Sequence, residues 1–141
     1  MLRIILLILR VAIGVVLGVL ISMFAIKAME WVGHQVFPVP GQIDVTDPQS
    51  VATYMDQIPL MSKIWVVLSW AVGAVLGGVV AGRISQMRWT SWIPGAFTLA
   101  GMVGIALMIP HPVWMLIAGA LAIAVSTWLA DRFGAPSAPA T

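Results

Sequence analysis

The hydrophobic pattern of this chain consists of four long apolar runs separated by short polar segments. The runs cover about residues 4–28, 60–84, 92–109 and 113–130. Because a helix rises 1.5 Å per residue, about 20 apolar residues cross the hydrocarbon core of a bilayer, and each run has that length or nearly so. Transmembrane β-strands would alternate apolar and polar residues, whereas these runs are apolar throughout. We therefore predict an all-α polytopic membrane protein, with four transmembrane helices in an antiparallel bundle.

The first apolar run follows a positively charged start, Met1-Leu2-Arg3, as the apolar part of a signal peptide would. The run is, however, much longer than the roughly 7–15 apolar residues of a signal peptide. The positions suited to a small-residue cleavage site hold Lys27 and Glu30 instead. We therefore expect the segment to be retained as the first span of a single domain, residues 1–133. A tail rich in Ala, Pro and Ser, residues 134–141, is expected to be disordered.

The longest connection, residues 37–59, is predicted to contain a helix of its own. Asp47-Pro48 combines an N-cap residue with a proline suited to the first helical position. The apolar residues that follow at spacings of i, i+3, i+4 and i+7 are Val51, Tyr54, Met55 and Ile58. This spacing predicts a short amphipathic helix that lies on the outer membrane surface or caps the bundle. The helix is either a lid without a partner or a docking surface.

The shorter connections are predicted to be tight turns. Pro110-His111-Pro112 is short enough to force the last two spans into an antiparallel hairpin. Before the third span, either Thr90 or Ser91 can serve as the N-cap, because hydroxyl side chains accept hydrogen bonds from the free N–H groups of a helix start.

Cations and tryptophans predict the orientation of the bundle. With the N-terminus inside, the cytoplasmic side receives Arg3, Arg83, Arg88 and Arg132, and the outer side receives only Lys27 and Lys63 with most of the acidic residues. Cytoplasmic segments near spans are enriched in Lys and Arg, so both termini are predicted to be cytoplasmic. Indole rings settle at the two membrane interfaces. The expected outer belt is Trp31, Trp65 and Trp114, and the inner belt is Trp89, Trp92 and Trp128.

Composition narrows the class of protein further. Hydrophobic residues make up 61% of the 141 residues and charged residues 9%, against about 25% charged residues in soluble domains, so a soluble enzyme and a disordered protein are excluded. The absence of cysteine excludes disulfides and thiolate chemistry. A net charge of +2 is too small for a nucleic-acid-binding surface.

Small residues form a face on each of the first two spans. The first span has Gly14, Gly18 and Ser22 at successive i+4 positions, and the second has Gly73, Gly77, Gly78 and Gly82 within one arc. Helices in lipid associate through close van der Waals packing, which such faces permit. The faces therefore serve either packing within one bundle or a contact between subunits.

The candidate chemistry is a polar cluster at the outer end, made of Lys27, Glu30, His34 and His111. The first three share one face of a helix at i, i+3 and i+7, which predicts a salt-bridged helix end. If His111 lies close to Glu30 and His34, two histidines and a carboxylate could hold a polar headgroup, relay a proton or bind zinc. The adjacent Lys27 would repel a metal cation, so metal binding is the weakest of these alternatives.

Arg10 lies about six residues into the first span, where a charge is costly. Its long side chain can reach the cytoplasmic interface, which lowers this cost. The alternatives are an ion pair with Asp131 at the inner end of the last span, or binding of a lipid phosphate.

The sequence contains no GxSxG, HExxH or P-loop pattern. The combination that does stand out is Gly33-His34 with Phe37-Pro38, Pro40-Gly41 and Asp44, then Trp70 through Arg83, then Pro110-His111-Pro112 with Trp114. It resembles a group of small bacterial four-span membrane proteins without an assigned biochemical role, which implies a bacterial inner membrane and no particular activity.

The function expected from these features is that of a non-enzymatic membrane protein, either a homo-oligomer or an accessory subunit that packs through glycine-rich faces. One alternative is a small oligomeric transporter or channel gated by Lys27, Glu30 and His34. Another is a membrane enzyme or metal binder at Glu30, His34 and His111. The expected partners are the lipid bilayer, further copies of the chain or other membrane subunits; no nucleic acid and no cofactor are expected.

Overall fold

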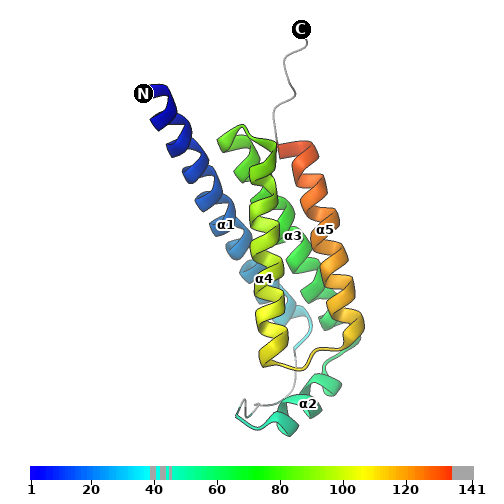
Figure 1. Cartoon of the computed structure of the whole chain (residues 1–141). Coiled ribbons are helices and arrows are strands. Elements are labelled where there is room, and N and C mark those ends of the chain that lie inside the picture. Colours follow the sequence, from blue (N-terminus) through cyan, green and yellow to red (C-terminus); the bar gives the residue numbers. More distant parts are fainter. Residues whose placement is uncertain (39–40, 42–43, 45, 135–141) are drawn as a thin grey trace.

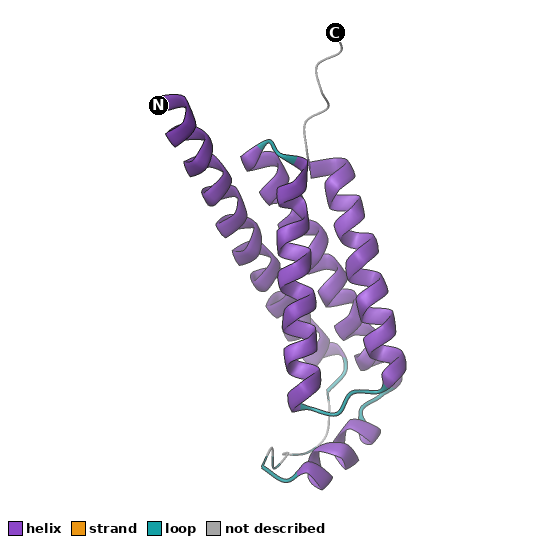
Figure 2. Cartoon of the chain, in the orientation of Figure 1, coloured by secondary structure: helices purple, strands orange, loops and turns teal. Residues whose placement is uncertain are grey.

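The structure is a computed structural model that describes residues 1–38, 41, 44 and 46–134 (Figure 1). These residues form five α-helices and one short 3₁₀ helix and contain no strand (Figure 2). In chain order the helices are α1 (Leu2–Val36), α2 (Pro48–Gln57), α3 (Leu60–Ser85), the 3₁₀ helix η1 (Arg88–Ser91), α4 (Trp92–Met108) and α5 (Val113–Gly134).

The predicted fold class is confirmed, because four helices of the described chain are long and apolar enough to cross a membrane. The protein is a multi-pass membrane protein. The helices of the last three spans, α3, α4 and α5, begin within a residue of their predicted starts. The 3₁₀ helix η1 adds one turn before α4. α1 is longer than the predicted span, since it continues through the polar cluster to Val36, and its 35 residues extend over about 52 Å.

The last span continues beyond its predicted end at residue 130. α5 continues to Gly134, which is buried and lies against Ser91 and Val79. The expected disorder of the tail concerns residues 135–141, which lie outside the described residues.

α3 is the central helix of the bundle. It contacts α1, α4 and α5, whereas within the described residues α1 and α5 do not contact each other. Figure 1 shows α4 and α5 running alongside α3, and the first turns of α1 standing apart from the other helices. The buried apolar cluster lies on the side of α3 that faces α4 and α5, and comprises Trp70, Ala74, Met102, Met115 and Ile123.

The contact between α1 and α3 is made by the predicted small residues. A Cβ atom added to Gly18 would lie 2.6 Å from the carbonyl oxygen of Gly77 and 2.7 Å from the Cβ of Ala81. A Cβ atom added to Gly14 would lie 2.9 Å from the backbone nitrogen of Ser85, and Ser22 is fully buried at the same contact. The two backbones can approach this closely only because side chains are missing between them.

The opposite side of α3 uses its remaining glycines in the same way. A Cβ atom on Gly78 would lie 2.6 Å from the Cβ of Ala130 on α5, and Gly82 lies against Ser91 and Gly134. The glycine faces are therefore buried within one chain. Because they are already covered, they are not available as the subunit contact that we expected as an alternative, and any contact between subunits must use another surface.

α2 has the predicted amphipathic structure. The carboxylate of Asp47 accepts hydrogen bonds from the backbone N–H groups of Gln49 and Ser50 at 3.1 and 3.2 Å, which confirms the N-cap. The predicted stripe begins at Val51, which is buried, and its other members are half-buried, while Asp56 on the other face is exposed. The stripe therefore faces the bundle.

The turn between α3 and α4 differs from the prediction. Ser91 precedes α4 but its side chain accepts no capping hydrogen bond, and the hydroxyl of Thr90 donates to the carbonyl oxygen of Met87 at 2.7 Å. Thr90 also hydrogen-bonds the hydroxyl of Ser85 at 2.6 Å. The hydroxyl groups of Thr90 and Ser85 thus hold the turn against the end of α3. The 3₁₀ helix η1 leads the backbone directly into α4, which begins without a side-chain cap.

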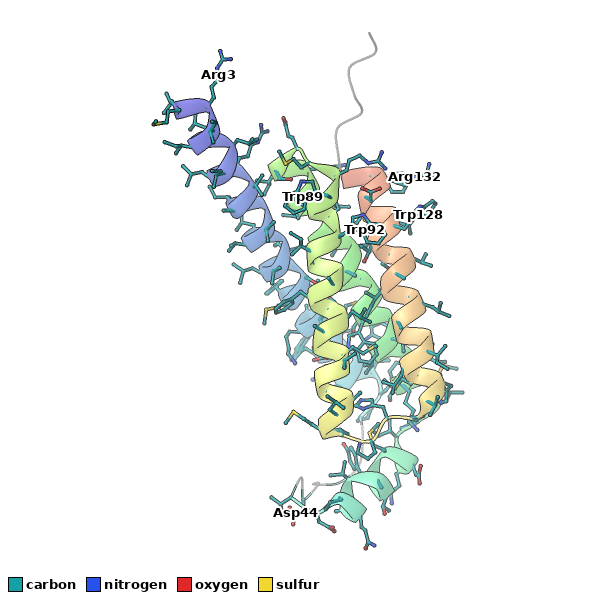
Figure 3. All side chains as sticks on the ribbon, viewed as in Figure 1. Arg3, Asp44, Trp89, Trp92, Trp128 and Arg132 are labelled. Atoms are coloured by element: carbon teal, nitrogen blue, oxygen red, sulfur yellow. The ribbon has the colours of Figure 1, made fainter. Side chains whose placement is uncertain are left out.

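The two ends of the bundle differ in the residues that they carry. Arg3, Trp89, Trp92, Trp128 and Arg132 lie toward one end, and Asp44 lies at the opposite end beside α2 (Figure 3). We call these the N-terminal end and the α2 end.

Candidate functional site

A cavity of about 190 Å³ lies between α2 and the adjacent end of the bundle. It is lined by side chains from α1, α2, α3, α5 and the α4–α5 connection, and we call it the α2 pocket. Its polar lining residues are Glu30, His34, Tyr54, Ser62, Lys63 and His111. The structure thus brings together three of the four residues of the predicted cluster, Glu30, His34 and His111, around one cavity.

Lys27, the fourth member of the predicted cluster, does not line the α2 pocket. Its Nζ donates to Oε2 of Glu30 at 2.8 Å, so the predicted salt-bridged helix end is confirmed. The Lys27 side chain is 79% exposed and that of Glu30 is 25% exposed. Such an exposed pair contributes about 1 kcal/mol or less to stability, but it supplies a counter-charge for the only carboxylate among the pocket's described residues.

The two histidines of the pocket have different surroundings. Nδ1 of His111 lies 2.7 Å from the carbonyl oxygen of Ile109, which accepts a hydrogen bond when this nitrogen carries the proton. In the neutral form, that tautomer leaves Nε2 as an acceptor. His34 is exposed on the last turns of α1. The tight Pro110-His111-Pro112 connection positions His111 at the α2 end.

The arrangement does not form a metal centre. Among the described residues, no group of three His, Asp or Glu side chains lies close enough together to hold a metal ion. Glu30, His34 and His111 therefore line one cavity without forming the ligand set that zinc requires.

Aromatic residues connect α1 to α3 beside the pocket. The indole N–H of Trp65 donates to the carbonyl oxygen of Met29 at 2.6 Å, and the rings of Phe37 and Trp65 are 6.0 Å apart between centroids. Gly33 allows this approach, because a side chain there would overlap the indole ring. These contacts hold the end of α1 against α3 and give the pocket a rigid aromatic wall.

Two pocket residues on the first turn of α3 were not identified from the sequence. The hydroxyl oxygen of Ser62 is buried and has no hydrogen-bond partner among the described residues. Lys63 is half-buried and forms no salt bridge in the described part of the chain. Neither residue has a sequence signal, since a serine and a lysine at the start of a span are typical of a membrane interface.

Arg10 contacts the C-terminal end of α3, which lies at the N-terminal end of the bundle. Its Nε donates to the carbonyl oxygen of Ile84 at 2.7 Å. The alternative pairing with Asp131 is wrong, because the carboxylate of Asp131 is bound by Arg88 at 2.7 Å. Binding of a lipid phosphate by Arg10 stays a prediction.

One exposed face of α1 has a regular pattern. Apolar residues at alternating spacings of four and three are all more than half exposed, and they lie opposite the buried face of Gly14 and Gly18: Leu2, Leu6, Leu9, Ile13, Val16 and Leu20. We call this set the α1 seam. The same 4–3 spacing forms the contact between helices in coiled coils.

Outside the spans, the turn before α2 holds one carboxylate with altered acidity. The hydroxyl and the backbone N–H of Thr46 both donate to Oδ1 of Asp44, at 2.5 and 3.0 Å. These hydrogen bonds stabilise the charged form and lower the pKa of Asp44 below its usual value. The side chain is fully exposed, so it organises the turn rather than a binding site.

No protein-family model, curated protein or solved structure matches this chain.

Proposed function

We propose that this chain is a non-enzymatic subunit of a bacterial inner membrane, with both termini in the cytoplasm, that assembles with a second copy of itself through the α1 seam. The observation that carries the proposal is the position of the seam. It lies on the face of α1 opposite to the glycines that pack on α3, and its residues are more than half exposed.

The length of α1 also supports assembly. Arg10 is bonded to Ile84 near the end of α3, and the eight residues Leu2–Leu9 continue for about 12 Å beyond this level. Seven of these eight residues are apolar. A second copy of α1 would cover this segment, which the other described residues of its own chain leave exposed.

The driving force for such a contact would be van der Waals packing. Lipid tails are as apolar as leucine side chains, so burial alone gains little within the bilayer. A 4–3 spacing keeps one row of side chains facing a partner helix over several turns and allows side chains to interlock.

The absence of cysteine makes the proposal directly testable, because a single introduced cysteine reports on its own position. Ile13→Cys and Val16→Cys place thiols on the α1 seam, and Leu121→Cys places a control thiol on α5 at similar exposure, 63% against 52% for Ile13. After mild oxidation of native membranes, the α1 variants should form a disulfide-linked band at twice the chain mass. A disulfide requires Cα atoms within about 7 Å, so Leu121→Cys should stay monomeric.

Two results would contradict self-assembly. Equal cross-linking of the α1 and α5 variants would indicate random collision, and no cross-linking would indicate that lipid covers the seam. A cross-linked band at a mass other than twice that of the chain would show that the partner at the seam is a different protein rather than a second copy. This is the result expected of an accessory subunit.

A further inference from the structure

The α2 pocket combines space, charge and an unused hydrogen-bond donor in a way that the proposed assembly does not employ. We propose that it binds an anionic amphiphile from the leaflet at the α2 end, that is, a carboxylate or phosphate head joined to an apolar chain. The site is independent of the α1 seam.

The size and the walls of the pocket suit part of a lipid-like molecule. Its volume of about 190 Å³ exceeds the roughly 150 Å³ of an apolar protein cavity that holds benzene. The apolar walls are formed by Phe37, Met55, Ile58, Trp65 and Met115. An apolar chain entering from the membrane would make van der Waals contacts with these walls.

The charge of the pocket favours an anion. The carboxylate of Glu30 is already paired with Lys27 outside the pocket, at 2.8 Å. Lys63 lines the cavity and forms no salt bridge with any described residue. The unbalanced charge at the lining is therefore positive. At an interface of intermediate polarity, a charge-assisted hydrogen bond from lysine is stronger than one between neutral groups.

The hydroxyl of Ser62 supplies a donor next to this cation. A buried polar atom without a partner is costly and rare in folded proteins. Ser62 belongs to the first turn of α3, where the positive end of the helix dipole also favours an anion. The oxygens of a carboxylate or phosphate head could accept from both Ser62 and Lys63, since both residues line the same cavity.

α2 closes the pocket on the side away from the membrane. Tyr54, Met55 and Ile58 belong to its apolar stripe and line the cavity, whereas Asp56 faces outward. The amphipathic helix would therefore cover the head of the bound molecule and separate it from water.

Tryptophan quenching by brominated amphiphiles tests this inference. The full-length protein in phosphatidylcholine nanodiscs is titrated with dibromostearic acid and, separately, with dibromostearyl alcohol, which has the same chain and a neutral head. Because Trp65 forms a pocket wall, its fluorescence should be quenched, and the Trp65→Phe variant measures the background from the six other tryptophans. The acid should reach half-maximal quenching at a concentration at least tenfold lower than the alcohol.

Variants assign this difference to the pocket. Lys63→Gln should raise the half-maximal concentration of the acid severalfold and leave that of the alcohol unchanged, and Ser62→Ala should have a smaller effect in the same direction. Arg83→Gln, which removes a cation at the other end of the same helix, is the matched control and should change neither value. Unaltered circular dichroism of each variant establishes that it is folded.

Brominated phosphatidic acid in place of the fatty acid distinguishes the two sources of the anionic head. Stronger quenching by either one supports the inference and identifies the head as carboxylate or phosphate. Equal half-maximal concentrations for acid and alcohol, or an unchanged acid titration in Lys63→Gln, would overturn it.

Discussion

Replacement of Gly18 by alanine tests the close contact between α1 and α3. The added Cβ atom would lie 2.6 Å from the carbonyl oxygen of Gly77, 2.7 Å from the Cβ of Ala81 and 3.1 Å from Cγ of Pro94. Ordinary van der Waals contact begins near 3.4 Å. α1 must therefore move away from α3 by about 0.8 Å, because two of these neighbours belong to the α3 helix itself and have no flexible side chain to displace.

The cost of this movement follows from the contacts that it loosens. A gap of about 0.5–1 Å forfeits a quarter to a half of the attraction between neighbouring atoms, and the loss extends to the adjacent contacts of Gly14 and Ser22. Lipid tails offer no hydrophobic compensation for the separated helices. We expect Gly18→Ala to lower the free energy of unfolding by about 1–3 kcal/mol, the usual range for overpacking.

The assay is unfolding by sodium dodecyl sulfate in mixed micelles, followed by circular dichroism and tryptophan fluorescence. Gly101→Ala is the matched control, because a Cβ atom added at this position on α4 would have no described atom within 4 Å apart from its chain neighbours and the backbone of its own helix. The control should raise stability by no more than about 1 kcal/mol, which is the usual gain of alanine over glycine within a helix. If Gly18→Ala were as stable as Gly101→Ala, the close packing of α1 on α3 would be refuted.

Two further predictions concern the interior and the orientation of the bundle. The hydroxyl groups of Ser22 and Thr98 form a buried hydrogen bond of 3.0 Å between α1 and α4. A double-mutant cycle with Ser22→Ala and Thr98→Val should give a coupling free energy of about 0.6 kcal/mol, and at most about 1.7 kcal/mol. A coupling free energy of zero would contradict the contact. For orientation, a membrane-impermeant maleimide should label Asp56→Cys in intact cells and Arg88→Cys only after permeabilisation, and the reverse pattern would contradict cytoplasmic termini.

Part of the candidate site could be anticipated from spacing alone. Glu30 and His34 are four residues apart, so any helix through them places both on one face, and the pairing of Lys27 with Glu30 follows from the same rule. The approach of His111 was a hypothesis, because nothing local relates it to α1. Ser62 and Lys63 could not be identified as site residues from the sequence. Ser62 stands out because its buried hydroxyl has no hydrogen-bond partner among the described residues, and Lys63 because it forms no salt bridge with them, and only the packed structure shows this.

The glycine faces illustrate a second limit. Their pattern predicted close helix contacts but not the partner of each face. In the structure, the face of α3 with Gly73 and Gly77 packs on α1, and the one with Gly78 and Gly82 packs on η1 and α5. Whether a glycine face packs within the chain or against another subunit depends on which other helices cover that face of α3. This arrangement is a property of the whole bundle and not of the local sequence.

The sequence by itself determined that the chain crosses a membrane in apolar helices, where these helices begin, and that α2 is amphipathic. These features depend on local chemistry, because hydrocarbon admits no unpaired backbone group and forces each apolar run into a helix. Only the tertiary structure decided which faces are covered. Hydrophobicity does not distinguish the α1 seam from the other apolar residues of α1, so the seam became visible only once the structure showed that α3 covers the glycines.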